Sequence, residues 1–140
     1  MNTRVLVANY MDEIWNKKQF EAIGNYLHKD FIDHSLPPSF LTSKEGTIKW
    51  IIDTGNSFEH KTIIEDQVTE GNKSIIRIRL FLKHIGIWRD IEPTGVTVSV
   101  VGYRYFRVHD DKIIEHWGLI DGQAIENQLK KELHGCKIAE

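Results

Sequence analysis

The first sixty residues carry apolar side chains at the spacing of helices. One stretch repeats every three or four positions, as on one face of a first helix: Val7, Met11, Ile14 and Trp15. A shorter stretch continues at this spacing in a second helix: Phe20, Ile23 and Leu27. Pro37 and Pro38 then exclude regular structure around them, because proline lacks a backbone N–H and restricts the residue before it. A third helix is predicted after Thr42, which stands three residues before Glu45 as in a capping box.

The second half of the chain alternates between apolar and polar residues, which is the pattern of strands. From residue 74 to residue 84, one face carries Ile76, Ile78, Leu80 and Leu82. A turn pair, Gly71-Asn72, separates this segment from a preceding strand. A long β-branched and aromatic segment follows near residues 96–108, and Asp110-Asp111 turns it into a further strand at 112–120. These last two strands are predicted to form a hairpin.

A last helix is predicted from Gly122 to His134, with Gly135 as its stop. Its inward side chains are Ile125, Leu129 and Leu133. Helices followed by antiparallel strands indicate an α+β fold, and strands much longer than the usual 5–6 residues twist and curl. We therefore expect one domain over residues 1–140, in which a curved antiparallel sheet and three N-terminal helices form a cone, with a C-terminal helix. Such a cone leaves a cavity at its wide end.

Composition narrows the classes of protein that the chain can belong to. The 140 residues hold 18 basic and 20 acidic side chains, a formal net charge of −2, which provides no broad basic surface for nucleic acid. The sequence contains no apolar stretch as long as a membrane-spanning helix, and its N-terminus lacks the pattern of a secretory signal. The single Cys136 cannot form an intrachain disulfide. We expect a soluble, cytoplasmic protein with neither nucleic acid nor membrane as a partner.

Four segments in order resemble the SnoaL-like polyketide cyclases and ester cyclases of the nuclear transport factor 2-like superfamily. They are Tyr10 to His34, His84-x-Gly86 with Pro93-Thr94-Gly95, Gly102 to Arg107, and Asp111 to Trp117 followed by Asp121. The resemblance implies a cone-shaped α+β fold. It also implies the reaction of these cyclases, which close rings of aromatic polyketide esters by an intramolecular aldol step without metal or cofactor. The superfamily further includes isomerases, dehydratases and members with no enzymatic role.

Asp121 is the first candidate for a catalytic acid/base. The resemblance implies this role, because an Asp at the matching position transfers the proton in the cyclases. Strand side chains alternate in direction, so Asp121 shares a face with Trp117 and Leu119, and an apolar surrounding inside the cavity would favour a general base. Leu119 departs from the cyclases, which carry polar side chains beside the Asp. A structural interpretation stands beside the catalytic one, since Asp121 directly precedes the last helix and Asp is a favoured N-cap.

Two histidines and an arginine are the other candidates. His34 can donate a hydrogen bond to a substrate oxygen or bond only to loop backbone, and its neighbour Asp33 is expected to be a turn residue. His84 ends the apolar face of its strand, either at the cavity mouth or at the edge of the core. Arg104 can bind a ligand oxyanion or pair with Glu115 across the hairpin, and the ion pair is favoured. The side chains expected to line the pocket are Trp117, Leu119, Tyr103 and Arg104.

Three functions follow from these expectations. The first is an enzyme that performs aldol cyclisation, isomerisation or dehydration on a small apolar carbonyl substrate. The second is a non-catalytic module that binds a small molecule in the same cavity and needs its aromatic lining but not the carboxylate. The third is a structural protein that dimerises through the outer face of its sheet. The histidines lack the spacing of metal ligands, so we expect neither metal nor cofactor, and the expected partners are an apolar ligand and a second copy of the chain.

Overall fold

The computed structural model describes residues 2–139, with side chains described from residue 2 to residue 131. Its first element is α1 (Thr3–Tyr10), whose N-cap Asn2 accepts a hydrogen bond from the backbone N–H of Val5 at 2.8 Å. The helix continues as a π-helix, η1 (Met11–Asn16), and a short 3-10 helix, η2 (Phe20–Asn25), follows. The predicted first helix is confirmed, and its apolar face is buried.

The segment after η2 is a strand, β1 (Leu27–Asp33), where the sequence predicted the end of a helix and irregular structure. β1 pairs in parallel with β5, so that Ile32 lies opposite Glu115 and Asp33 opposite His116. The prediction was wrong because the prolines act only on the residues next to them, four positions beyond the end of β1. The partner strand lies more than eighty residues away along the chain and leaves no local sign of the pairing.

Helix α2 (Lys44–Ser57) confirms the third predicted helix. Its N-cap is Ser43 rather than Thr42, and Ser43 makes no side-chain capping bond to the backbone. The predicted capping box is therefore wrong. Gly46 in the first turn packs directly on the Leu41 backbone, where a Cβ would overlap the carbonyl oxygen.

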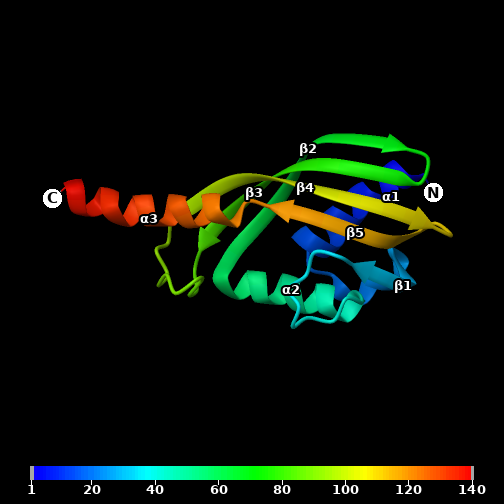
Figure 1. Ribbon diagram of the computed structural model, residues 1–140, viewed down its shortest axis with the longest axis horizontal. Coiled ribbons are helices and arrows are strands. Elements are labelled where there is room, and N and C mark those ends of the chain that lie inside the picture. The colour runs from blue at the N-terminus through cyan, green and yellow to red at the C-terminus, as the bar shows by residue number, and fades with distance from the viewer. Residues whose placement is uncertain (1, 140) are drawn as a thin grey trace.

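Four antiparallel strands complete a five-stranded sheet of order β1-β5-β4-β3-β2: β2 (Phe58–Glu70), β3 (Lys73–His84), β4 (Thr97–His109) and β5 (Lys112–Ile120). Tight turns join two of the pairs, as predicted. Gly71 has a φ of +59°, and Asp110 and Asp111 have φ values of +50° and +59°, the left-handed conformation that two-residue hairpins require. Figure 1 shows α1 and α2 on the same side of this curved sheet.

Helix α3 (Gly122–Ala139) follows β5 directly and projects beyond the end of the sheet (Figure 1). Its residues Ile125 and Leu129 are buried, as predicted, while the side chain of Leu133 lies outside the described residues. The helix continues past Gly135, because glycine inside a helix costs only about 1 kcal/mol and does not by itself end it. No helix among residues 2–139 is both long and apolar enough to cross a membrane. The α+β cone is confirmed.

Candidate functional site

A cavity of about 390 Å³ lies inside the cone, between the inner face of the sheet, α2 and the first turns of α3. Aromatic and aliphatic side chains form most of its wall, including Trp15, Trp50, Phe58, Leu80, Trp88 and Ile120. Two arginines, Arg89 and Arg104, add positive charge, and Asp53 is the acidic residue of this wall. This volume lies within the range of ligand sites in proteins.

A second hollow of about 220 Å³ adjoins the cavity and shares Trp50, Arg104 and Ile120 with it. Its other lining residues include Asp33 and Ser35, which make it the more polar of the two. Arg104 therefore lies in the wall between the two hollows. A molecule in the main cavity would have an apolar surface around most of its body and guanidinium groups at two points, Arg89 and Arg104.

The polar centre of the interior is a chain of three buried side chains, Asp33, His116 and Arg104, each at most 5% exposed. Nδ1 of His116 lies 3.0 Å from Oδ2 of Asp33, and Nε2 of His116 lies 3.3 Å from Nη1 of Arg104. A guanidinium can only donate, so Nε2 is the acceptor and Nδ1 carries the proton that is donated to Asp33. The site thus holds a neutral imidazole between a carboxylate and a guanidinium.

Burial and hydrogen bonding determine the charges of these three side chains. Burial lowers the pKa of His116, and the positive charge of Arg104 lowers it further, so the ring is neutral at neutral pH. Burial alone raises the pKa of Asp33, but hydrogen bonds from His116 and Ser35 outweigh that effect and hold the pKa below its ordinary value. Burial also lowers the pKa of Arg104, and an arginine nevertheless keeps its charge in proteins.

Three elements position these groups. Asp33 ends β1, and its carboxylate accepts hydrogen bonds from the backbone N–H and the hydroxyl of Ser35, at 2.9 and 2.7 Å. Arg104 on β4 lies opposite Gly118 on β5, and its guanidinium stacks 4.2 Å above the ring of Trp15. A Cβ at Gly118 would lie 3.0 Å from the His116 ring and 3.1 Å from Nη1 of Arg104. Glycine at this position therefore leaves the space in which the two side chains meet.

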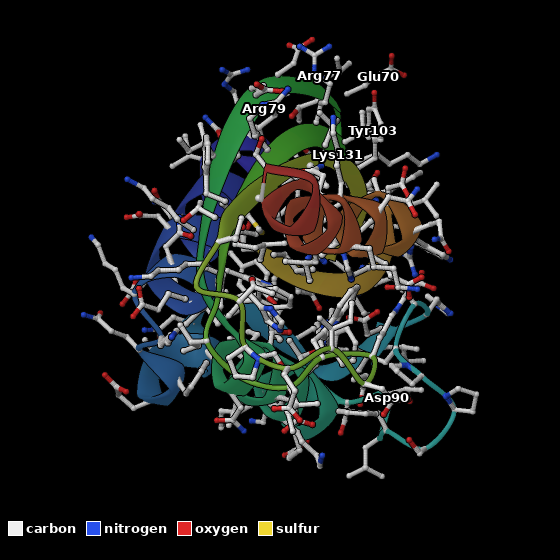
Figure 2. All side chains as sticks on the ribbon, turned by 90° about the vertical axis from the view of Figure 1, so that its left-hand side faces the viewer. Glu70, Arg77, Arg79, Asp90, Tyr103 and Lys131 are labelled. Carbon is white, nitrogen blue, oxygen red and sulfur yellow. The ribbon has the colours of Figure 1, made fainter. Side chains whose placement is uncertain are left out.

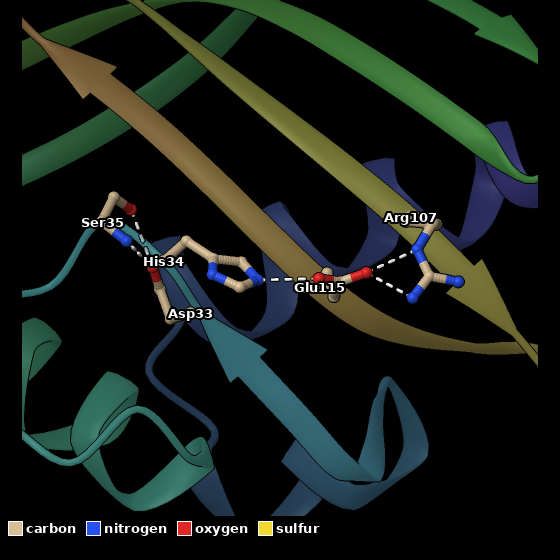
Figure 3. A network of polar contacts seen from close by, with 5 residues as sticks. All are labelled: Asp33, His34, Ser35, Arg107 and Glu115. Carbon is tan, nitrogen blue, oxygen red and sulfur yellow. Dashed lines mark hydrogen bonds and ion pairs between the residues drawn. The ribbon is translucent and has the colours of Figure 1, made fainter.

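His34 and Glu115 form a separate network (Figure 3), and neither residue lines the cavity or the second hollow. Nε2 of His34 donates to Glu115 at 2.7 Å, and Arg107 donates to the other oxygen of the same carboxylate. The His34 ring stacks on Trp117 at 4.5 Å. The predicted pairing of Arg104 with Glu115 is wrong, because alternate residues of β4 face opposite sides and Arg107 is the arginine on the side of Glu115.

Of the other side chains predicted to line the cavity, Leu119 lines the second hollow, whereas Trp117 and Tyr103 line neither hollow. Trp117 is 39% and Leu119 75% exposed, and Tyr103 on the neighbouring strand is 47% exposed. Asp121 is exposed at the start of α3, where its Oδ1 accepts a hydrogen bond from the backbone N–H of Ala124 at 2.9 Å. It has the geometry of an N-cap. The cavity placement of Trp117 and Asp121 was wrong, because β5 carries apolar side chains on both faces and its sequence alone does not tell them apart. The placement of Tyr103 was wrong because Tyr103 is next to Arg104 on β4, and neighbouring strand side chains face opposite sides.

His84 is fully buried at the end of β3. Its Nδ1 accepts a hydrogen bond from the backbone N–H of Thr94 at 3.2 Å, and its ring packs against Phe58. Its place is the edge of the core rather than the wall of the cavity, which was one of the two predicted possibilities.

Sequence reasoning missed His116 and took Asp33 for a turn residue. One signal was present. Arg104 stands in an otherwise apolar alternation, Val98, Val100, Gly102, Phe106 and Val108, and a charged residue on a buried face needs a partner. Counting back through the Asp110-Asp111 turn, however, pairs Arg104 with Trp117. Only the bulge between Arg107 and Val108 shifts the register by one residue, so that Gly118 lies opposite Arg104 and His116 is on the inner face. Among the described residues, no group of three or more His, Cys, Asp or Glu side chains could hold a metal ion.

Comparison with known proteins agrees with this architecture. Residues 5–129 match the family model of the SnoaL-like polyketide cyclases. The chain belongs to this family. No curated protein matches the sequence.

Solved structures share the SnoaL-like fold over nearly their whole length. Wild-type IdmH from Streptomyces antibioticus has a TM-score of 0.84 at 22% identity, covering 93% of this chain and 99% of its own. TsrD from Streptomyces laurentii has a TM-score of 0.79 at 22% identity, with 92% and 98% covered. A SnoaL-like polyketide cyclase from Agrobacterium tumefaciens has a TM-score of 0.76 at 19% identity, with 92% and 99% covered. At such identities these structures show the fold alone.

Proposed function

We propose that this SnoaL-like protein is a cofactor-free acid/base catalyst that forms an enolate from a small, largely apolar carbonyl compound. The observation that carries the proposal is the buried chain Asp33–His116–Arg104 beside an apolar cavity. A neutral imidazole oriented by a carboxylate is the arrangement of a general base, and a neighbouring guanidinium suits a developing oxyanion. This centre takes the place of the predicted Asp121.

The reaction follows from the protonation states. A substrate carbonyl oxygen accepts the hydrogen bond that Nη1 of Arg104 gives to His116, which frees the lone pair of Nε2. Nε2 then removes the proton from the carbon beside the carbonyl, and the electron pair of the C–H bond moves into an enolate whose oxygen is held by Arg104. Asp33 stabilises the resulting imidazolium through Nδ1. In an aldol closure, the enolate carbon forms a bond to a second carbonyl carbon, and the alkoxide takes the proton back from Nε2.

Deuterium exchange tests this proposal. The wild-type protein and two variants, Asp33→Asn and His116→Gln, are incubated in D2O with a panel of 1,3-dicarbonyl and aryl-ester carbon acids, and label uptake is read by mass spectrometry. We expect uptake above buffer in the wild type and a loss of about 10²–10⁴-fold in His116→Gln, the usual contribution of a general base. Asp121→Asn is the matched control and keeps the wild-type rate, because asparagine is an equally good N-cap. Full exchange in His116→Gln, or loss of exchange in Asp121→Asn, would contradict the proposal.

A non-catalytic binding module is the second candidate function. The observation that favours it is the 3.3 Å contact in which Arg104 covers the lone pair of His116, together with an apolar cavity wall. In that case aromatic ligands bind with equal affinity to the wild type and to His116→Gln, and no carbon acid in the panel exchanges. Substitution of Trp50 by alanine then weakens binding, since this side chain lines both hollows.

We further propose a homodimer formed through the outer face of the sheet. The exposed apolar side chains Tyr103, Trp117 and Leu119 support it, because they lie on adjacent strands and present a patch that water solvates poorly. Light scattering across a dilution series should give the dimer mass for the wild type and the monomer mass for Leu119→Glu. A wild-type monomer at all concentrations would refute the pairing.

A further inference from the structure

The loop between β3 and β4 forms part of the cavity wall with a tight turn of unusual composition. Trp88 and Ile91 exchange two backbone hydrogen bonds, of 3.1 and 2.9 Å, which leaves Arg89 and Asp90 as the central residues of the turn. Both have positive φ, +47° and +62°. Asp adopts this conformation readily, whereas Arg does so at a cost in free energy of about 1 kcal/mol or more. The turn thus holds an arginine at a position where glycine is favoured.

The strained turn directs Arg89 onto the cavity. Its guanidinium lies 4.6 Å from the centre of the Trp88 ring, and both residues line the 390 Å³ cavity. It also fills the space beside Gly122, where a Cβ would lie 2.5 Å from Nη2. A positive charge at the beginning of α3 opposes the helix dipole, so the dipole does not favour an arginine at this place.

The charge of Arg89 is incompletely paired. Among the described side chains, the carboxylate within 4 Å of its guanidinium is that of Glu126, at 3.6 Å, which exceeds hydrogen-bond length. Glu126 in turn accepts a hydrogen bond from Lys130 at 3.2 Å. The side chain of Arg89 is 46% exposed, so its planar N–H groups are open to a ligand at the cavity. Guanidinium binds carboxylate and phosphate oxygens in a two-pronged geometry.

We propose that Arg89 binds an anionic oxygen group, carboxylate or phosphate, carried by the substrate of this cavity, while the aromatic body of the substrate lies against the tryptophans. The inference rests on the proposed function only in that the same cavity holds the substrate. The substrate class is then an aromatic compound with an acidic group at the end nearest Arg89. Arg104 remains available for the reacting carbonyl at the other polar point of the wall.

Isothermal titration calorimetry with three probes of the same shape tests this assignment: 2-naphthoate, 2-naphthyl phosphate and the neutral 2-naphthamide. We expect at least one of the two anions to bind the wild type about tenfold or more tightly than the amide, the usual effect of a charge-assisted pair. Whichever anion is preferred identifies the group as carboxylate or phosphate. Equal affinities for all three probes would overturn the proposal.

Variants assign the preference to Arg89. Arg89→Gln should lose it, whereas Arg77→Gln should keep it. Arg77 is a matched control, because it is also 46% exposed and lies 3.7 Å from a carboxylate, that of Glu65. Figure 2 shows it at the opposite end of the view from Asp90 and its loop. A preference that survives in Arg89→Gln places the anion elsewhere and refutes the inference.

A second variant keeps the test decisive where Arg89→Gln folds poorly. Glu126→Gln removes the competing carboxylate, so affinity for the anionic probe should rise about twofold to fivefold while affinity for 2-naphthamide stays constant. An unchanged anion affinity in Glu126→Gln counts against the assignment. These titrations measure binding and involve no chemical step. An absence of deuterium exchange would therefore contradict the proposed catalysis without affecting the anion-binding result. Equal probe affinities would contradict anion binding by Arg89 without affecting the exchange test.

Discussion

The stability of the protein in mild acid depends on His60, a half-buried residue of β2. Burial lowers the pKa of His60 from 6.5 to about 4, and the positive charges of Lys18 and Arg104 act in the same direction. Its Nε2 has no hydrogen-bond partner among the described residues, so the ring is held in its neutral form by its surroundings. In the unfolded chain the same ring takes up a proton near pH 6.5.

This difference predicts the sign and size of a pH effect. Between about pH 4 and pH 6.5 the unfolded state binds more protons than the folded state, so stability is complete above this window and falls as pH decreases through it. From about pH 6.5 to pH 5 the loss is at most about 2 kcal/mol, at roughly 1.36 kcal/mol per pH unit. Screening by solvent around a half-buried ring reduces the expected value to about 1 kcal/mol.

Replacement of His60 by phenylalanine removes the titrating group and keeps an aromatic ring against Trp15. The free energy of unfolding is measured by urea titration, followed by circular dichroism, at about pH 7, 6 and 5. We expect the decrease from pH 7 to pH 5 to be about 1 kcal/mol smaller in His60→Phe than in the wild type. His109→Phe, at an exposed histidine of a hairpin end, should retain the wild-type decrease. Equal decreases in the wild type and His60→Phe would refute the reasoning.

Three further substitutions have outcomes that the structure determines. Asp121→Ala removes the N-cap of α3 and should lower the free energy of unfolding by about 1 kcal/mol in urea titrations, whereas Asp121→Asn should change it little. Gly118→Ala places a Cβ against His116 and Arg104, so we expect a fall in the deuterium-exchange rate together with a lower melting temperature, because overpacking costs about 1–3 kcal/mol. Leu129→Ala empties a fully buried position on α3 and should cost about 2–5 kcal/mol, measured by thermal and urea unfolding.

Local pattern was sufficient for the long antiparallel strands and for the helices. The alternation of Ile76, Ile78, Leu80 and Leu82 predicted the buried face of β3, and all four side chains are buried. The two-residue turn at Asp110-Asp111 predicted the last hairpin, because few residue types adopt positive φ in succession. In these cases the physical cause acts between residues that are neighbours in the chain.

Neither the parallel strand β1 nor the inward-pointing face of β5 could be predicted in the same way. β1 is short and owes its conformation to hydrogen bonds with β5, which follows some eighty residues later. In β5, Trp117 and Leu119 are as apolar as the side chains that face the core, so hydrophobicity alone suggested the wrong side. Which face is buried depends on where α1 and α2 cover the sheet, and the local sequence of β5 contains no information about that.

The sequence by itself determined the α+β class, the curved sheet and the presence of a cavity, because these follow from residue spacing, strand length and turn chemistry. Only the tertiary structure decided the candidate site. Asp33 and His116 are 83 residues apart and meet across a parallel strand pair, while Arg104 reaches them from a third strand over the space left by Gly118. The orientation of each side chain is set by sheet register and helix packing, which are properties of the assembled fold.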